Sequence, residues 1–354
     1  MDNIENNKFQ IQDIIKKIAE NPLEPENYLY LGKLYLVNQD YDSALGIYES
    51  LLSIDSKNIQ ALINSGSIYF CKYDFQKAIN NYSRAAELDT NNMSVYFNLG
   101  NAYAELGDFG KSLSNYLKAL NIDKNNPEIC AAIGLLYQDN KEFLEAKVYY
   151  DKAYRLDPNN MENVLNLACI MMKLYKFEEA IELFQKALTF DGKNIKTLLC
   201  LANAYSSITQ YATANEYFEN VLMLKPDYYQ GLICYAISLC EQDRDDKAIE
   251  IYKKAVAIDE NNNAKILLGN LYCSIGKYDE AIDMYKRVLE NDSDSASTYV
   301  LLANTYVLKD ELKLAIQTYK KAIEIDKDND ETKLIYLEMV DEFIKRKFPV
   351  GKGV

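Results

Sequence analysis

The side chains of this chain that could do chemistry are carboxylates, cysteines and amides, because its 354 residues include no histidine. Without histidine the chain cannot supply a Ser-His-Asp triad, a Cys-His pair or a His-Glu-x-x-His zinc site. Its seven cysteines do not show the close pairing of a thiolate metal site, and the glycines form no phosphate-binding loop. The sequence therefore predicts a chain that is not an enzyme, with no catalytic residue, no cofactor and no metal ligand.

Asparagine is the residue type whose placement indicates binding. An amide side chain both donates and accepts hydrogen bonds, so it can pair with the main chain of a bound peptide whatever that peptide's side chains are. The asparagines hold two recurring positions, Asn64, Asn98 and Asn166 at the first and Asn101, Asn203, Asn270 and Asn304 at the second.

A unit of 34 residues brings these positions into register, and a period of this length indicates a repeat array. Counted from the first residue of each unit, position eight is Gly or Ala and position twenty is Ala or Ser. Position eleven is Tyr in seven units, and position twenty-four is always Tyr or Phe. The nine units are residues 25–58, 59–92, 93–126, 127–160, 161–194, 195–228, 229–261, 262–295 and 296–329.

Each unit is predicted to form two antiparallel helices, called here its first and second helix. Positions four, seven, eight and eleven place apolar or small residues on one face of the first helix. Small residues at positions eight and twenty allow the helices to approach closely, and the aromatic residue at position twenty-four fills the space beside them. Gly107 and Gly276 stand where a first helix should end in a left-handed residue. Asp at position thirty-one of eight units predicts a turn in which the side chain binds its own backbone.

The two ends are predicted to be capping helices, at residues 1–24 as a half-repeat and at residues 330–354 with a short basic tail. Terminal repeats need a polar outer face for solubility, which favours a closing helix after the last unit. Each end has one apolar stripe, Ile11, Ile14, Ile15 and Ile18 at the first and Leu334, Leu337, Val340 and Ile344 at the second.

The junction after unit 229–261 is expected to pack irregularly. This unit is one residue short, in the loop Asp259-Glu260-Asn261-Asn262. Lys265 then occupies position four of the next unit, where it is the poorest fit.

These residues resemble the tetratricopeptide repeat, most clearly in Leu99-Gly100-Asn101-Ala102-Tyr103, Ala119 and Pro158. The resemblance covers residues 25–329 and departs from the family pattern in having no tryptophan. It implies an all-α, right-handed α-solenoid superhelix in which first helices line a concave groove. Positions two, five, six, nine, twelve and thirteen then face that groove.

The resemblance implies a site for a partner on this groove. Position five is apolar throughout, and Asn98 and Asn101 are similar to the asparagine ladder that holds extended peptides in O-linked N-acetylglucosamine transferases. Position five is never Lys, so the family's clamp for chaperone C-termini is not expected. The predicted groove residues are Asn64, Phe97, Asn98, Asn101, Leu165, Asn166, Lys196, Leu199, Asn203, Ile233, Ile266, Asn270 and Asn304. Their alternative role is structural: the asparagines would satisfy helix ends or neighbouring first helices, and position five would pack between repeats.

The composition narrows the class of partner. A net charge of −14 disfavours nucleic acid, whose phosphates need a basic face. No apolar run is long enough to span a membrane and no signal segment is evident, so a cytoplasmic location is expected. The apolar position five and an acidic rim favour a partner segment that is apolar with basic flanks. Oligomeric state is not predicted.

The sequence therefore predicts a non-catalytic scaffold or adaptor that holds a peptide or an amphipathic helix of a partner protein in its groove. Two alternatives stay open. The chain could be the repeat arm or regulatory subunit of a separate enzyme, such as a glycosyltransferase or peptidase complex. It could instead organise a secretion, division or pilus assembly.

Overall fold

The computed structural model describes residues 2–259 and 262–347, with side chains from Phe9 onward. Within these residues the α-helix is the only regular secondary structure, which confirms the predicted all-α class. The helices are α1 Asp2–Glu20, α2 Pro25–Val37, α3 Tyr41–Ile54, α4 Ile59–Cys71, α5 Phe75–Leu88, α6 Met93–Glu105, α7 Phe109–Ile122, α8 Pro127–Asp139, α9 Phe143–Leu156, α10 Met161–Lys173, α11 Phe177–Phe190, α12 Ile195–Ser207, α13 Tyr211–Leu224, α14 Tyr229–Glu241, α15 Asp245–Val256, α16 Asn263–Ser274, α17 Tyr278–Asn291, α18 Ala296–Leu308, α19 Leu312–Ile325 and α20 Asp330–Lys347.

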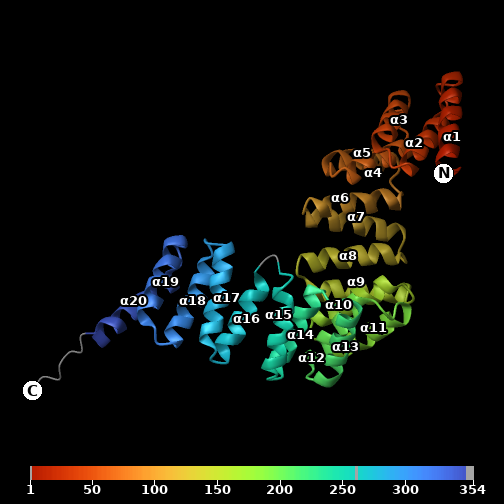
Figure 1. Ribbon diagram of the computed structural model, residues 1–354. Helices are drawn as coiled ribbons and strands as arrows, with labels where there is room; N and C mark the ends of the chain where they lie inside the picture. The colour runs from red at the N-terminus through yellow and green to blue at the C-terminus, as the bar shows by residue number, and fades with distance from the viewer. Residues whose placement is uncertain (1, 260–261, 348–354) are drawn as a thin grey trace, which may run out of the picture. The chain divides into compact units, whose positions relative to one another are not determined.

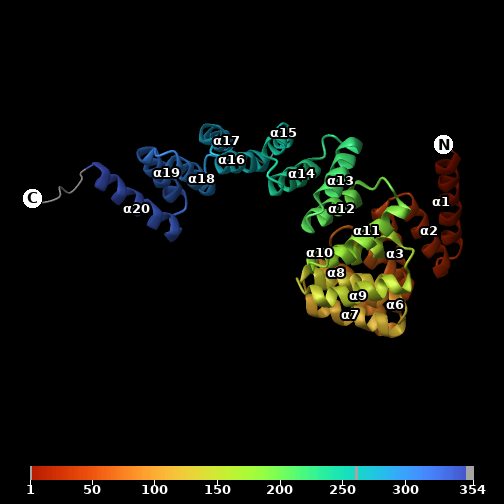
Figure 2. The same cartoon turned by 90° about the horizontal axis from the view of Figure 1, so that it is seen from below.

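The helices form a solenoid of helix-turn-helix repeats, as Figures 1 and 2 show within each part of the chain. The chain divides into two compact parts, each of several repeats, which are called unit 1 (Met1–Leu183) and unit 2 (Phe184–Val354) from here on. The 34-residue segments are called repeats. In each unit a helix packs mainly on its neighbours along the chain. The predicted solenoid with a half-repeat at its start and a closing helix at its end is confirmed. None of the described helices is long and apolar enough to cross a membrane.

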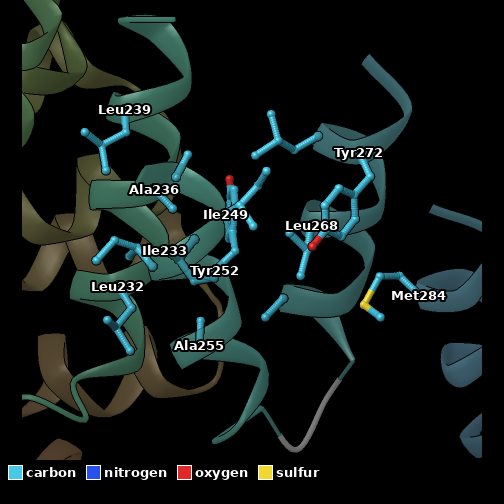
Figure 3. Packing of buried hydrophobic residues seen from close by; sticks show 14 of the residues in the cluster. Leu232, Ile233, Ala236, Leu239, Ile249, Tyr252, Ala255, Leu268, Tyr272 and Met284 are labelled. Atoms are coloured by element: carbon cyan, nitrogen blue, oxygen red, sulfur yellow. The ribbon is translucent and has the colours of Figure 1, made fainter. Parts of the chain in front are cut away.

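The small residue at position eight and the aromatic residue at position twenty-four make the closest contact inside a repeat. A Cβ added to Gly100 would lie only 2.4 Å from Cδ1 of Tyr116, and at the same position of four other repeats the corresponding distance to the tyrosine ring is 2.4 to 2.7 Å. Each tyrosine ring therefore passes directly against the backbone of its first helix. Figure 3 shows the same layer in unit 2, where Tyr252 and Ala255 lie between α14 and α16.

The loops between repeats are closed by side-chain hydrogen bonds. In seven of the eight repeats with Asp at position thirty-one, its Oδ1 accepts from the backbone N two residues later, which confirms the predicted turn. The Asn three residues after that Asp often caps the next first helix, as Asn92 does by accepting from Val95 N at 3.3 Å. The backbone is thus satisfied at both ends of a short connection.

The turn inside each repeat needs one left-handed residue. Gly107 and Gly276 adopt φ of +71° and +77°, which confirms their predicted role. In the other seven repeats a residue with a side chain takes the same conformation, for example Thr209 with φ of 60°.

The short repeat changes its loop. Helix α15 ends at Val256, and Oδ2 of Asp259 accepts from Ala264 N at 2.7 Å. Lys265 donates to Oδ1 of Asn262 at 2.9 Å, so the cation at position four is bonded to the loop. The loop residues Glu260 and Asn261 of this prediction lie outside the described residues.

The two terminal helices pack differently from their predicted stripes. In α1, Ile14 is buried and Ile18 packs on the α2 core, but Ile15 is exposed. In α20 the predicted stripe is wrong: Leu334, Leu337 and Ile344 are exposed. The side that packs on the rest of unit 2 is Thr332, Ile335, Tyr336 and Met339. The basic tail after Lys347 lies outside the described residues.

Candidate functional site

Two adjoining clefts lie on the first helices in the middle of unit 1. The α6–α8 cleft is lined by Asn101, Glu105, Leu135 and Asp139, among others. The α8–α10 cleft, of about 630 Å³, is lined by Phe97, Ala131, Leu135 and Asn166 together with the carboxylates of Glu128 and Glu162. Leu135 belongs to both clefts and is 50% exposed. The pair of clefts is therefore an apolar floor with acidic walls.

The predicted groove residues of unit 1 have different places in this geometry. Asn101 lines the α6–α8 cleft, and Phe97 and Asn166 line the α8–α10 cleft. Phe97 also packs against the ring of Tyr116, with ring centroids 5.7 Å apart. Asn98 and Leu165 are half-buried on the same first helices. The structure therefore brings together part of the predicted set, centred on α6, α8 and α10.

The asparagines at position nine have a structural partner that the sequence did not predict. Oδ1 of Asn101 accepts from the hydroxyl of Tyr116 at 2.6 Å, and Oδ1 of Asn270 accepts from Tyr285 at 2.7 Å. Asn304 accepts in the same way from Tyr319. Burial raises the pKa of Tyr116 to about 12, so its hydroxyl stays protonated and donates at neutral pH. In these three repeats the Asn at position nine therefore serves the tyrosine at position twenty-four of the same repeat.

In unit 2 the predicted groove residues are partly core. Leu199 and Ile233 are each only 6% exposed and belong to the hydrophobic core, so they are packing residues and not open groove surface. Asn203 Nδ2 contacts Sγ of Cys234 at 3.8 Å, which links α12 to α14. Lys196, Asn270 and Asn304 are exposed, and Ile266 is half-buried. Position five thus takes the packing role in these two repeats.

Sequence models of one repeat family match the chain over most of the helical array. Models described as TPR repeat and tetratricopeptide repeat match residues 66–107 and 100–141 and residues 228–294 and 262–328. Two further tetratricopeptide repeat models match residues 127–160 and 165–190. The chain belongs to the tetratricopeptide repeat family. No curated protein matches it in sequence.

Solved structures of tetratricopeptide repeat proteins are similar in fold. PilF of Pseudomonas aeruginosa is 22% identical, with a TM-score of 0.52, over 61% of this chain and 97% of that chain. YrrB, described as a TPR protein with an unusual peptide-binding site, is 20% identical with a TM-score of 0.44, over 52% of this chain and 95% of its own. MamA is 21% identical with a TM-score of 0.44, over 47% of this chain and 96% of its own. At these identities the similarity shows the fold alone.

Leu135 is the groove residue that sequence reasoning missed. It stands at position nine, where other tetratricopeptide repeats of this chain have Asn, Ser, Lys, Cys or Ile. The sequence did contain a signal for Leu135. Position nine faces the groove, and a leucine there has no polar partner within its own repeat. Tyr150, which would otherwise donate to position nine, reaches instead toward Oε1 of Gln138 at 3.5 Å.

The thiols and carboxylates of the described residues were the remaining candidates for nucleophiles and metal ligands. Burial raises the pKa of the Cys240 thiol to about 11 and also raises that of Cys130. A thiol is reactive as its thiolate, so these two are weak nucleophiles at neutral pH. Among residues 9–259 and 262–347, no three Cys, Asp or Glu side chains come together as a metal site.

Proposed function

We propose that unit 1 holds a segment of a partner protein on α6, α8 and α10, and that the chain acts as a non-catalytic scaffold. The observation that carries this proposal is Leu135, an exposed leucine shared by two clefts with carboxylates on both sides. Tetratricopeptide repeats in general bind proteins and peptides. The proposal is that this one does so at the apolar floor around Leu135.

The chemistry of the clefts defines the partner segment. An apolar side chain of the partner that covers Leu135, Ala131 and Phe97 is removed from water. For a side chain of leucine or phenylalanine size, full burial contributes about 1.5–3 kcal/mol to the free energy of binding. Glu105 and Asp139 line one cleft and Glu128 and Glu162 line the other. We therefore expect an apolar residue flanked by Lys or Arg, with binding that weakens as salt increases.

The amides supply sequence-independent contacts. No described residue forms a hydrogen bond with the side chains of Asn98 or Asn166, whereas Asn101 is bonded to Tyr116. Asn98 and Asn166 are therefore the amides that can bind a partner's backbone without loss of an internal bond. Substitution of Asn98 and Asn166, rather than of Asn101, therefore tests whether amides contribute to partner binding.

A selection from randomised octapeptides tests the proposal. We expect wild-type protein to enrich peptides with an apolar residue between basic ones. The double variant Glu128→Gln with Glu162→Gln should lose the basic preference, because two carboxylates of one cleft are neutralised. The matched control, Glu145→Gln with Glu178→Gln, removes the same charge from exposed positions on second helices and should select the same peptides as wild type. Equal loss in both double variants would contradict a site at these clefts.

A further inference from the structure

A third cleft, on α2 and α4 of unit 1, has the opposite chemistry. This α2–α4 cleft, of about 550 Å³, is lined by Leu29, Tyr30, Lys33, Leu36, Tyr48, Gln60 and Asn64. No carboxylate is among these lining residues, in contrast to the α6–α8 and α8–α10 clefts. Six of the seven stand at positions predicted to face the groove, although only Asn64 is among the individual groove residues predicted from sequence.

Tyr48 forms the floor of this cleft with an unsatisfied hydroxyl. Its side chain is fully buried, and its hydroxyl oxygen has no hydrogen-bond partner among the described residues. A Cβ added to Gly32 would lie 2.8 Å from that oxygen, so the hydroxyl lies directly against α2, one of the two helices that form the cleft. A buried hydroxyl without a partner is destabilising, because it has lost its bonds to water.

The residue at position nine explains why Tyr48 is unsatisfied. In three other repeats an Asn there accepts from the equivalent tyrosine, and in a fourth Ser67 lies 3.0 Å from the Tyr82 hydroxyl. In the first repeat this position is Lys33, whose ammonium group has three donors and no acceptor. A tyrosine and a lysine that line the same cleft therefore both need an acceptor.

The other polar groups of the cleft also present donors. Oδ1 of Asn64 already accepts from Nε2 of Gln60 at 2.9 Å, and the Asn64 amide lies toward the phenol of Tyr48. Burial raises the pKa of Tyr48, so its hydroxyl keeps its proton at neutral pH. Lys33 is exposed and forms no ion pair with a described residue. Two groups in one cleft, on Lys33 and Tyr48, can thus donate to a single acceptor.

We propose that the α2–α4 cleft binds a carboxylate of the partner segment, either an Asp or Glu side chain or the free C-terminus. The carboxylate accepts from Tyr48 and Lys33, with Leu29 and Leu36 beside its aliphatic carbons. This inference rests on the proposed function and adds a second, anionic feature to the partner. It differs from the family's clamp for chaperone C-termini, whose lysine stands at position five, where this repeat has Leu29.

The octapeptide selection separates this inference from the proposed function. We expect wild-type protein to enrich a carboxylate in addition to the basic-flanked apolar residue. Selection from the same library with amidated C-termini distinguishes the two sources, because only a terminal carboxylate is lost on amidation. Tyr48→Phe and Lys33→Met should each weaken binding of the best peptide roughly ten- to hundredfold, as expected for a lost bond to a charged group. Lys124→Met, a matched loss of one exposed lysine, should leave its affinity unchanged.

The outcomes of this selection are distinct. If Tyr48→Phe and Lys33→Met select the same peptides as wild type with the same affinity, the carboxylate site is wrong and the Leu135 clefts stand. If the enrichment of carboxylates is lost in Tyr48→Phe while substitution of Glu128 and Glu162 has no effect, the carboxylate site stands and the site at the Leu135 clefts is wrong. A library from which nothing is enriched contradicts both proposals.

Thermal unfolding of the full chain without peptide gives an independent test. Tyr48→Phe removes a hydroxyl that has no partner, so we expect the Tm to stay the same or rise. Tyr116→Phe is the matched control, since it removes a hydroxyl bonded to Asn101 at 2.6 Å, and its Tm should fall. An equal fall for both variants would show that Tyr48 is already satisfied inside the protein and would overturn the inference.

Discussion

At the scale of single residues, the tyrosines at position twenty-four connect the core of a repeat to its groove. The ring fills the space beside Gly or Ala at position eight, and the hydroxyl then needs a partner at position nine. Asparagine at position nine is therefore part of the fold before it is part of any binding site. Sequence alone could not separate these roles, because an amide suits both.

Asn101→Ala tests this structural role. The substitution leaves the hydroxyl of Tyr116, whose side chain is 4% exposed, without its acceptor. We expect a loss of about 1–3 kcal/mol in the free energy of unfolding, measured by denaturant titration. Asn98→Ala, on the same helix and without an internal bond, should change it by less than about 0.5 kcal/mol. Equal effects would mean that Asn101 has no structural role of this kind.

Thr209→Gly tests the strain in the turn of a repeat. Thr209 has φ of 60°, a conformation that is unfavourable for a β-branched residue, and its side chain is exposed. We expect stabilisation of about 1 kcal/mol, because relief of backbone strain exceeds the entropic cost of glycine. The reverse change at the same turn position, Gly107→Thr, should destabilise. A destabilised Thr209→Gly variant would refute the strain argument.

At the scale of helices, the repeat period was sufficient to predict where most elements begin. Position one starts the first helix in eight of the nine repeats, as at Met93 and Pro127, and the Asp turn before it was foreseen from the Asp alone. The capping by Asn92 and its equivalents was missed, because only the Asp of the Asp-x-x-Asn pattern was considered. The pattern itself was visible in the sequence.

The closing helix α20 shows a limit of hydrophobic periodicity. Leu334, Leu337 and Ile344 fall on one face, and Ile335, Tyr336 and Met339 fall on the adjacent one, so both faces are apolar. Helical spacing cannot choose between two adjacent apolar faces. The register of the preceding repeats can, because position three is buried in eight of the nine repeats and is continued by Thr332.

A matched pair of truncations tests the orientation of α20. Ile335→Ala removes a side chain that packs on the core of unit 2 and should cost about 1–2 kcal/mol. Leu334→Ala removes an equal number of atoms from a side chain that is 59% exposed, and its effect should stay within about 0.5 kcal/mol. The free energies of unfolding from denaturant titration decide the matter. A larger loss of stability in Leu334→Ala than in Ile335→Ala would mean that the stripe predicted from sequence is the packed face.

At the scale of the whole molecule, stability is local because a repeat contacts mainly its neighbours. Tyr252→Ala creates a cavity between α14 and α16 in unit 2 and should cost about 3–5 kcal/mol there. We expect faster hydrogen exchange for amides of α14, α15 and α16 and unchanged exchange in α6 to α9 of unit 1. A uniform acceleration along the chain would show global, two-state unfolding instead.

The binding surface could be predicted from the sequence only in part. The period and the repeat family predicted the fold and the groove face of the first helices. They did not predict which repeats leave that face open. Leu199 and Ile233, at position five, are buried, whereas Leu135, at position nine, is exposed. Sequence positions fix which face a residue is on, and packing decides whether a partner can reach it.

Site-specific photocrosslinking tests the central claim, that partners bind at the clefts around Leu135. Benzoylphenylalanine is placed at Leu135 of α8 or, as control, at Leu144 of α9, a second-helix position that is 67% exposed. The probe is the octapeptide most enriched by wild-type protein. We predict crosslinks from position 135, competed by unlabelled peptide and reduced by salt, and none from position 144. Crosslinks only from position 144 would contradict the account.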